Sequence, residues 1–275
     1  MTAALLEGGS DERGITMKLE GKIVAITGGA QGIGAAIARR VFEAGARVAV
    51  LDIDATKAAS MAKECSAPGR AALAVACDVS ERANVFEAVE RVVKECGGLH
   101  VMIANAGIAQ VRPFMELTEA DWDRMLAINV KGVVFSFQAA AKHMIESKTK
   151  GRLIAASSIA GHQGYALLAH YCASKFSVRA VVQACAKEFA PYGINVNAYC
   201  PGIVDTSMWG AMDRHLSQMT GAAPGEMLKK YARMALLKRP ETPEDIAGLV
   251  AFLASDDAAA INGQALIVDG GIVFV

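Results

Sequence analysis

The sequence lacks an excess of charge of either sign. Its 275 residues include 28 Lys and Arg and 28 Asp and Glu, so the formal net charge is +0. A protein that binds nucleic acid through its phosphates needs a positive field, and this balance therefore argues against a nucleic-acid binder. The hydrophobic fraction of 53% is high, so the chain is expected to fold and not to stay disordered.

Long apolar runs are also missing. No stretch approaches the ~18–20 apolar residues that a membrane-spanning helix requires. The first residues carry Glu7, Asp11 and Glu12 where a secretion signal would be basic and then apolar. We therefore expect a cytoplasmic protein without a membrane segment. Residues 1–18 are predicted to be a flexible N-terminal extension, and residues 19–275 a single domain.

The sequence also lacks a metal-binding pattern of cysteines. Its six cysteines stand at positions 65, 77, 96, 172, 185 and 200. They form no C-x-x-C pair, and the spacings of Cys and His match no zinc site. We interpret the cysteines as reduced and mostly buried thiols, and we predict no metal.

What the sequence does contain is a regular alternation of short apolar strands and helices. Strands are predicted at 24–27, 47–51, 71–77, 99–104, 152–156, 194–199 and 266–268, and helices at 33–44, 81–96, 118–147, 167–190 and from 243. Continuous apolar strands separated by helices predict an α/β fold, in which a parallel sheet is covered by helices on both faces.

The segment 206–235 differs from this alternation. It holds five of the 12 methionines, together with Gly210, Gly221, Pro224 and Gly225. Flexible Met side chains suit a surface that adapts to a ligand, and glycines suit hinges. We interpret the segment as a substrate lid. The alternative, an amphipathic helix pair packed on the sheet, stays open.

A glycine-rich turn from Thr27 to Gly34 follows the first strand and opens the first helix. Glycines there let the backbone approach a pyrophosphate, which the helix N-terminus attracts. The G-x-x-x-G-x-G spacing is weak evidence by itself. Asp52 strengthens it, because a carboxylate at the end of the second strand can accept both ribose hydroxyls and repels a 2′-phosphate. The sequence therefore predicts NAD as the cofactor and disfavours NADP.

Tyr171 and Lys175 are four residues apart on a predicted helix, so both project from one face. An unperturbed phenol, with a pKa of about 10, is a poor acid or base at neutral pH. A neighbouring ammonium favours the phenolate and is expected to lower that pKa. Of the five tyrosines, Tyr171 alone has Lys four residues later.

In order along the chain, the Thr27–Gly34 turn, Asn105-Ala106-Gly107, Asn129, Ser158, Tyr171-x-x-x-Lys175 and Pro201-Gly202 resemble the short-chain dehydrogenase/reductase family over residues 19–275. The resemblance implies a Rossmann-like, doubly wound, parallel seven-stranded sheet in the order 3-2-1-4-5-6-7 and a homotetramer. It also implies a catalytic tetrad. Ser158 would bind the reacting oxygen, Tyr171 would exchange its proton, Lys175 would lower the tyrosine pKa and hold the nicotinamide ribose, and Asn129 would position a relay water.

The same resemblance implies the residues that contact the cofactor. They are Gly28, Gln31, Gly32, Ile33, Gly34, Asp52, Ile53, Asp78, Val79, Asn105, Ala106, Gly107, Tyr171, Lys175, Pro201, Gly202, Val204 and Thr206.

For the substrate, the segments 175–179, 197–209 and 268–274 are similar to acetoin reductases (2,3-butanediol dehydrogenases). The Tyr171–Lys175 stretch also resembles sorbitol-type polyol dehydrogenases, which stay the alternative. Ser158, Ile159, Tyr165 and Trp209 are the predicted substrate contacts, with Gln110, His162 and Gln163 as further polar candidates. Ile159 and Tyr165 replace polar residues of those enzymes and would favour a more apolar alcohol or ketone. Two other readings are weaker, a 3-oxoacyl thioester reductase and a non-catalytic NAD sensor.

Overall fold

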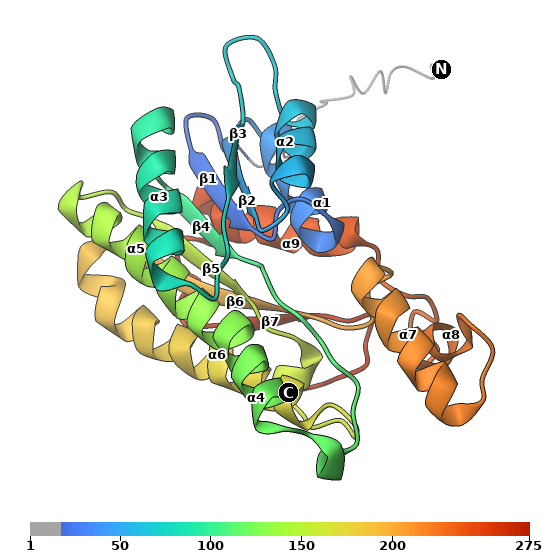
Figure 1. The fold of residues 1–275 in the computed structure, drawn as a ribbon. Coiled ribbons are helices and arrows are strands. Elements are labelled where there is room, and N and C mark those ends of the chain that lie inside the picture. Colours follow the sequence, from blue (N-terminus) through green and yellow to red (C-terminus); the bar gives the residue numbers. More distant parts are fainter. Residues whose placement is uncertain (1–17) are drawn as a thin grey trace, which may run out of the picture.

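The computed structural model describes residues 18–275, so the predicted extension lies, except for Lys18, outside the described residues. A seven-stranded sheet of order β3-β2-β1-β4-β5-β6-β7 forms its centre (Figure 1). All neighbouring strands pair in parallel, which confirms the predicted doubly wound architecture. The strands are β1 (Ile23–Thr27), β2 (Arg47–Asp52), β3 (Leu73–Ala76), β4 (Val101–Ala104), β5 (Arg152–Ala156), β6 (Asn195–Pro201) and β7 (Ala265–Val268).

Helices cover both faces of the sheet (Figure 1). Helices α1 (Gly32–Glu43), α2 (Ala55–Glu64) and α9 (Pro243–Ala254) share one apolar core with the sheet. Helices α3 (Arg82–Cys96), α5 (Gly132–Glu146) and α6 (Ala169–Phe189) share the other. Every residue of β1 and β5 is buried, because each strand is covered on both sides. This arrangement explains why these strands are continuous apolar runs and do not alternate.

The helix expected over 118–147 is interrupted. It begins as α4 (Glu119–Leu126), where Thr118 and Asp121 form a capping box, and it continues as α5 from Gly132. Between the two lies a π-helical turn, Ala127–Lys131, which contains Asn129. Such turns are rare and occur frequently at functional sites.

Helices α7 (Ser207–Thr220) and α8 (Glu226–Ala232) project from the sheet beyond the end of β6 (Figure 1). Their apolar side chains pack mainly against one another and against the segments that follow β4 and β5, through Val111 and Ile159. The pair therefore does not lie across a sheet face. Among residues 18–275, no helix has both the length and the apolar character that a bilayer crossing requires.

The sheet order reverses between β1 and its two neighbours, β2 and β4. Successive connections therefore leave the carboxyl ends of β1 and β4 toward opposite faces and open a crevice between them. In doubly wound sheets this crevice is where ligands bind.

Candidate active site

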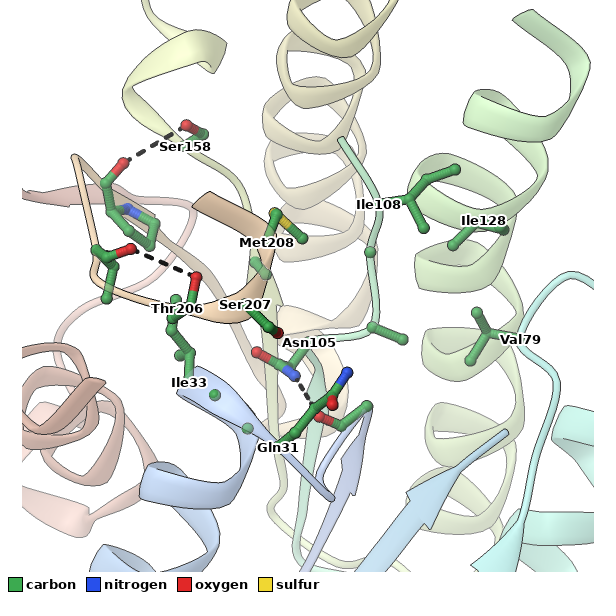
Figure 2. Close-up of a pocket in the computed structure, with 18 of the residues that line it drawn as sticks. Gln31, Ile33, Val79, Asn105, Ile108, Ile128, Ser158, Thr206, Ser207 and Met208 are labelled. Carbon is green, nitrogen blue, oxygen red and sulfur yellow. Dashed lines mark hydrogen bonds between the residues drawn. The ribbon is translucent and has the colours of Figure 1, made fainter. Parts of the chain in front are cut away.

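A cavity of about 410 Å³ occupies this crevice and extends to the start of α7. All eighteen residues predicted to contact the cofactor line it, as do Ser158 and Trp209. Nine further lining residues were not among the predicted site residues: Cys77, Ile108, Arg124, Ile128, Ala156, Ser157, Tyr199, Ser207 and Met208. Figure 2 shows Ser207 and Met208 above the glycine-rich turn.

The glycine-rich turn has no room for side chains at two positions. Gly28 has a φ of +60°, and a Cβ there would lie 2.9 Å from the Cα of Ala106. A Cβ on Gly34 would lie 2.1 Å from the carbonyl oxygen of Gly28. The N-cap of α1, Gln31, makes no side-chain capping hydrogen bond, so no side chain occupies the amide groups at this helix end. The turn therefore fits the close backbone approach and the anion binding that a pyrophosphate requires.

Asp52 stands at the cavity end of β2 and is almost fully buried. One carboxylate oxygen accepts from the backbone N–H of Ala30 at 3.1 Å and the other from that of Asp54 at 3.0 Å. Because each oxygen retains a second acceptor site, these bonds orient the carboxylate and leave it able to accept hydroxyl groups. The cationic residues of the cavity wall, Arg124 and Lys175, come from α4 and α6 and not from the turn or β2.

Asn105 joins three strand ends at the floor of the cavity. Its Nδ2 donates to the carbonyl oxygen of Thr27 at 3.0 Å and to that of Gly28 at 2.9 Å; Figure 2 shows the bond to Gly28. Its Oδ1 accepts from the hydroxyl of Tyr199 at 2.8 Å. Tyr199 is fully buried on β6, and its spacing in the sequence gave no sign that it would reach Asn105.

Ser158, Tyr171 and Lys175 converge at the other end of the cavity. Ser158 follows β5, and its hydroxyl accepts from the N–H of Ala160 at 3.1 Å. Lys175 is 4% exposed, and its Nζ donates to the carbonyl oxygen of Ala156 at 2.8 Å. The same Nζ lies 5.7 Å from the ring centre of Tyr171. The helical spacing of four residues therefore brings the phenol and the ammonium to one site, as expected.

The electrostatics of this group correct one expectation. Burial raises the pKa of Tyr171 to about 12, and its hydrogen bond with Ser158 acts in the opposite direction. Burial also lowers the pKa of Lys175 to about 8. In the protein alone, desolvation of both groups therefore outweighs the attraction that was expected to lower the tyrosine pKa.

Asn129 is fully buried in the π-helical turn and does not reach the cavity wall. Its Oδ1 accepts from the N–H of Ile108, and its Nδ2 donates to the carbonyl oxygen of Ile108, both at 2.9 Å. A Cβ on Gly107 would lie 3.2 Å from Asn129 Oδ1 and 3.5 Å from Lys175 Nζ. Gly107 therefore leaves space between the asparagine and the lysine.

Two predicted substrate contacts lie behind the cavity wall and not on it. Ile159 is buried against Ile203 and Ala232, and Tyr165 packs beside this cluster. The hydroxyl of Tyr165 accepts from Gln163 Nε2 at 2.6 Å. The turn after Ser158 directs these side chains beneath α7 and α8, so they support the wall that Trp209 forms.

Gln110, a further polar candidate, is already engaged. Its Nε2 donates to Asp121 Oδ1 at 2.8 Å, and its Oε1 is 3.1 Å from Nε2 of the fully buried His170. His162 likewise contacts Cys200 Sγ at 3.4 Å. The polar candidates are thus bonded to other residues of the protein, whereas Ser158 and Tyr171 line the cavity. Among residues 18–275, no group of three or more His, Cys, Asp or Glu could hold a metal ion.

Comparisons with known proteins found one matching family and several similar chains. The family described as short chain dehydrogenase matches residues 22–217. An L-2,3-butanediol dehydrogenase of Corynebacterium glutamicum is 42% identical, over 92% of this chain and 99% of its own. A diacetyl reductase [(S)-acetoin forming] of Staphylococcus epidermidis is 40% identical over 92% of this chain and 99% of its own. The crystal structure of a short-chain type dehydrogenase/reductase from Mycobacterium marinum matches with a TM-score of 0.86 at 30% identity, over 94% and 98% of the two chains.

Proposed function

Because the chain belongs to the short-chain dehydrogenase family, we propose that it interconverts a small secondary alcohol and its ketone by hydride transfer with NAD. The observation that carries this proposal is the convergence of Ser158, Tyr171 and Lys175 at one end of a cavity whose other end is the glycine-rich turn and Asp52. The proposal includes a cytoplasmic homotetramer, in which residues 206–235 act as the substrate lid.

The reaction follows from the protonation states of these side chains. Tyr171 is a neutral phenol at pH 7, since its pKa is raised to about 12, and it can donate a proton to the oxygen of a ketone as the carbonyl carbon is reduced. Ser158 holds that oxygen through its hydroxyl. Lys175 and Asn129 hold the proton path behind the phenol, across the space that Gly107 leaves. Bound NADH supplies the hydride, and NAD⁺ accepts it in the opposite direction.

Alcohol oxidation requires the reverse proton transfer, from the hydroxyl to the phenolate form of Tyr171. Burial of Tyr171 opposes that form, so at neutral pH the phenol is in the protonation state that ketone reduction uses. We therefore expect the oxidation rate to rise with pH and the reduction rate to fall, because the two directions need opposite protonation states of one group.

Replacement of Tyr171 by Phe tests the mechanism. Loss of the proton donor should lower kcat for acetoin and diacetyl reduction by about 10²–10⁴, while the Kd for NADH should stay within about twofold, since the ring remains. Steady-state assays of NADH oxidation and a fluorescence titration with NADH measure the two quantities. A Tyr171→Phe enzyme with wild-type turnover would overturn the proposal.

Asp52 supports NAD as the cofactor, because its carboxylate would repel a 2′-phosphate. The Asp52→Asn variant keeps the shape and one acceptor oxygen but removes the charge and the second acceptor. We expect the ratio of kcat/KM for NADH over NADPH to fall by about 10–100-fold, which is ~1.4–2.8 kcal/mol of discrimination. Wild-type enzyme that prefers NADPH would contradict the assignment, and so would an unchanged ratio in the variant.

The substrate is proposed to resemble acetoin or 2,3-butanediol. The support is similarity to relatives whose names give these activities, together with a cavity that Met208 and Trp209 line along with Ser158. A polyol needs several polar partners, and the structure pairs Gln110 and His162 with other residues. We expect kcat/KM to be higher for diacetyl and acetoin than for ketoses by at least about tenfold, and a panel of ketones assayed with NADH measures it.

A further inference from the structure

Glu241 is a buried carboxyl group that the proposed mechanism does not use. It is 4% exposed, and neither of its oxygens has a hydrogen-bond partner among the described residues. A buried charge without a partner is costly, so such a group is expected either to bind a proton or to move. Glu241 stands where the chain returns from α8 toward α9.

The backbone of Glu241 is bonded to the wall of the cavity. Its N–H donates to the carbonyl oxygen of Ile203, and its own carbonyl oxygen accepts from the N–H of Asp205, both at 2.9 Å. These bonds form a parallel bridge to Val204, which lines the cavity. A displacement of Glu241 therefore moves the Ile203–Asp205 segment.

The carboxyl group of Glu241 is wedged between two glycines. A Cβ on Gly202 would lie 3.0 Å from its Oε2, and a Cβ on Gly270 would lie 3.3 Å from its Oε1. Gly202 lines the cavity, whereas Gly270 follows β7. The carboxyl group thus fills the space directly behind a part of the wall that is predicted to contact the cofactor.

The charged groups near Glu241 are two acids, Asp269 and Asp245, and one arginine, Arg239. Asp269 is 5% exposed, and its oxygens accept from the N–H groups of Gly271 and Val273. Asp245 on α9 also lies close enough to repel a charge on Glu241, and Arg239 is bound to Asp245 by an ion pair of 2.6 Å. Arg239, which would attract a charge on Glu241, is thus already paired with Asp245, whereas Asp269 and Asp245 would repel that charge.

We propose that Glu241 is a positioning residue for the dinucleotide site, which holds the Gly202–Val204 wall in place while its carboxyl group is uncharged. The inference rests on the proposed dinucleotide site. Ionisation of Glu241 would place a negative charge beside Asp269, behind Gly202. Because that space is already filled, the charge could be solvated only if water entered or the side chain moved. The bridge to Val204 would then pass that movement to the cavity. Burial, with the charge of Asp269, raises the pKa of Glu241 to about 7, so the change falls near neutral pH.

The test is the pH dependence of NADH binding by the full chain, measured by fluorescence titration between about pH 5.5 and 8.5. The Kd of the wild type should rise about tenfold as the pH passes 7. In Glu241→Gln, which keeps the shape without the charge, the Kd should stay low over the same range. Glu244→Gln is the matched control, because Glu244 is exposed on the next turn of the chain, and it should behave as the wild type does.

A second measurement needs no dinucleotide. The folded-state pKa of Glu241 lies above the ordinary value of 4.5, so its protonated form stabilises the fold below that value, and this contribution is lost as the pH rises through about 7. Compared with Glu241→Gln, the wild type should therefore lose free energy of unfolding between about pH 4.5 and 7, measured by urea denaturation. Glu241→Met serves the same comparison if the Gln variant does not fold.

Two results would overturn the inference. One is a Kd for NADH that rises equally with pH in the wild type and in Glu241→Gln, and the other is equal pH dependence of unfolding in these two proteins. A wild type that binds no NADH would instead refute the proposed function, and the unfolding measurement would still decide whether Glu241 is uncharged.

Discussion

At the scale of single residues, the candidate site concentrates polar groups that the rest of the core excludes. Lys175, Ser158 and Asn129 are each at most 8% exposed. Burial of a polar group costs free energy unless a partner is provided. Asn129 has its partners, but the ion pairs found among residues 18–275 do not include Lys175. The protein therefore holds a buried ammonium for a reason other than stability.

Lys175→Met should make the protein more stable and less active. Burial lowers the pKa of Lys175 from 10.5 to about 8, so the cost of the ammonium is fully present below pH 8 and disappears as the pH rises toward 10.5. At pH 7 the variant should gain about 1–2 kcal/mol in free energy of unfolding, less than the full desolvation cost because Ala156 loses its donor. Its kcat should fall by about 10² or more.

Urea denaturation and NADH oxidation assays measure both effects. Lys187→Met is the control, since Lys187 is exposed on the same helix, and it should change stability by less than about 0.5 kcal/mol. The gain at Lys175 should shrink above pH 8, and a variant that is destabilised at pH 7 would contradict the argument.

The sequence predicted the residues of the cofactor end better than those of the substrate end. The positions of Gly28 and Asp52 were predictable because they follow directly from a glycine-rich turn and from the end of a strand. That of Lys175 was predictable because it lies four residues from Tyr171 on the same helix. Ile159 and Tyr165 could not be placed, because the direction of the turn after Ser158 depends on how α7 and α8 pack over it. Tyr199 meets Asn105 across 94 residues, a contact that only the strand order brings about.

At the scale of helices and strands, periodicity predicted the long elements and missed the short polar ones. The sheet order and most helices were predictable because apolar runs and amphipathic faces repeat. The α2 helix was not predicted, since its buried face consists of only Ala58, Met61 and Ala62. The π-helical turn at Asn129 was also hidden, because its pattern continues that of α4 and α5. Local backbone departures of this kind depend on tertiary hydrogen bonds.

Asp213 holds the two helices of the proposed lid together, a role that the sequence gave no signal for. It is 4% exposed on α7, and its oxygens accept from the N–H groups of Gly225 (2.6 Å) and Leu228 (2.9 Å) at the start of α8. These bonds lower the pKa of Asp213 and act as a cap supplied from another helix.

Asp213→Ala should therefore loosen the lid without changing the dinucleotide site. We expect KM for the ketone to rise about 5–10-fold, corresponding to a loss of ~1–1.4 kcal/mol, while the Kd for NADH stays unchanged. Amide hydrogen exchange over residues 207–232 should quicken, and exchange in β1 should not. Glu90→Ala, an exposed change on α3, is the control. An equal loss of NADH affinity would show that α7 and α8 belong to the cofactor site instead.

At the scale of the whole molecule, most of the apolar side chains are buried in two cores, and a smaller group is exposed. The two cores bury the apolar side chains on the two faces of the sheet. Large apolar side chains nevertheless remain exposed at residues 236–237 and 274–275. Leu236 and Leu237 are both 65% exposed, Phe274 is 78% exposed and Val275 is 88% exposed. The N–H of Leu237 donates to the carbonyl oxygen of Gly270, so the segments that carry these side chains lie together. Exposed apolar groups gathered in this way mark interaction surfaces.

We expect this surface to contact a second copy within the proposed homotetramer. Light scattering should then give a mass about four times 28.8 kDa. Phe274→Glu should shift the distribution to smaller species, because each copy would bury an unpaired carboxylate at the contact. Met115→Glu is the control, since Met115 is 92% exposed but lies in the segment after β4, and it should leave the mass unchanged. A monomeric wild type, or a Phe274→Glu protein of unchanged mass, would mean that this apolar end has another use.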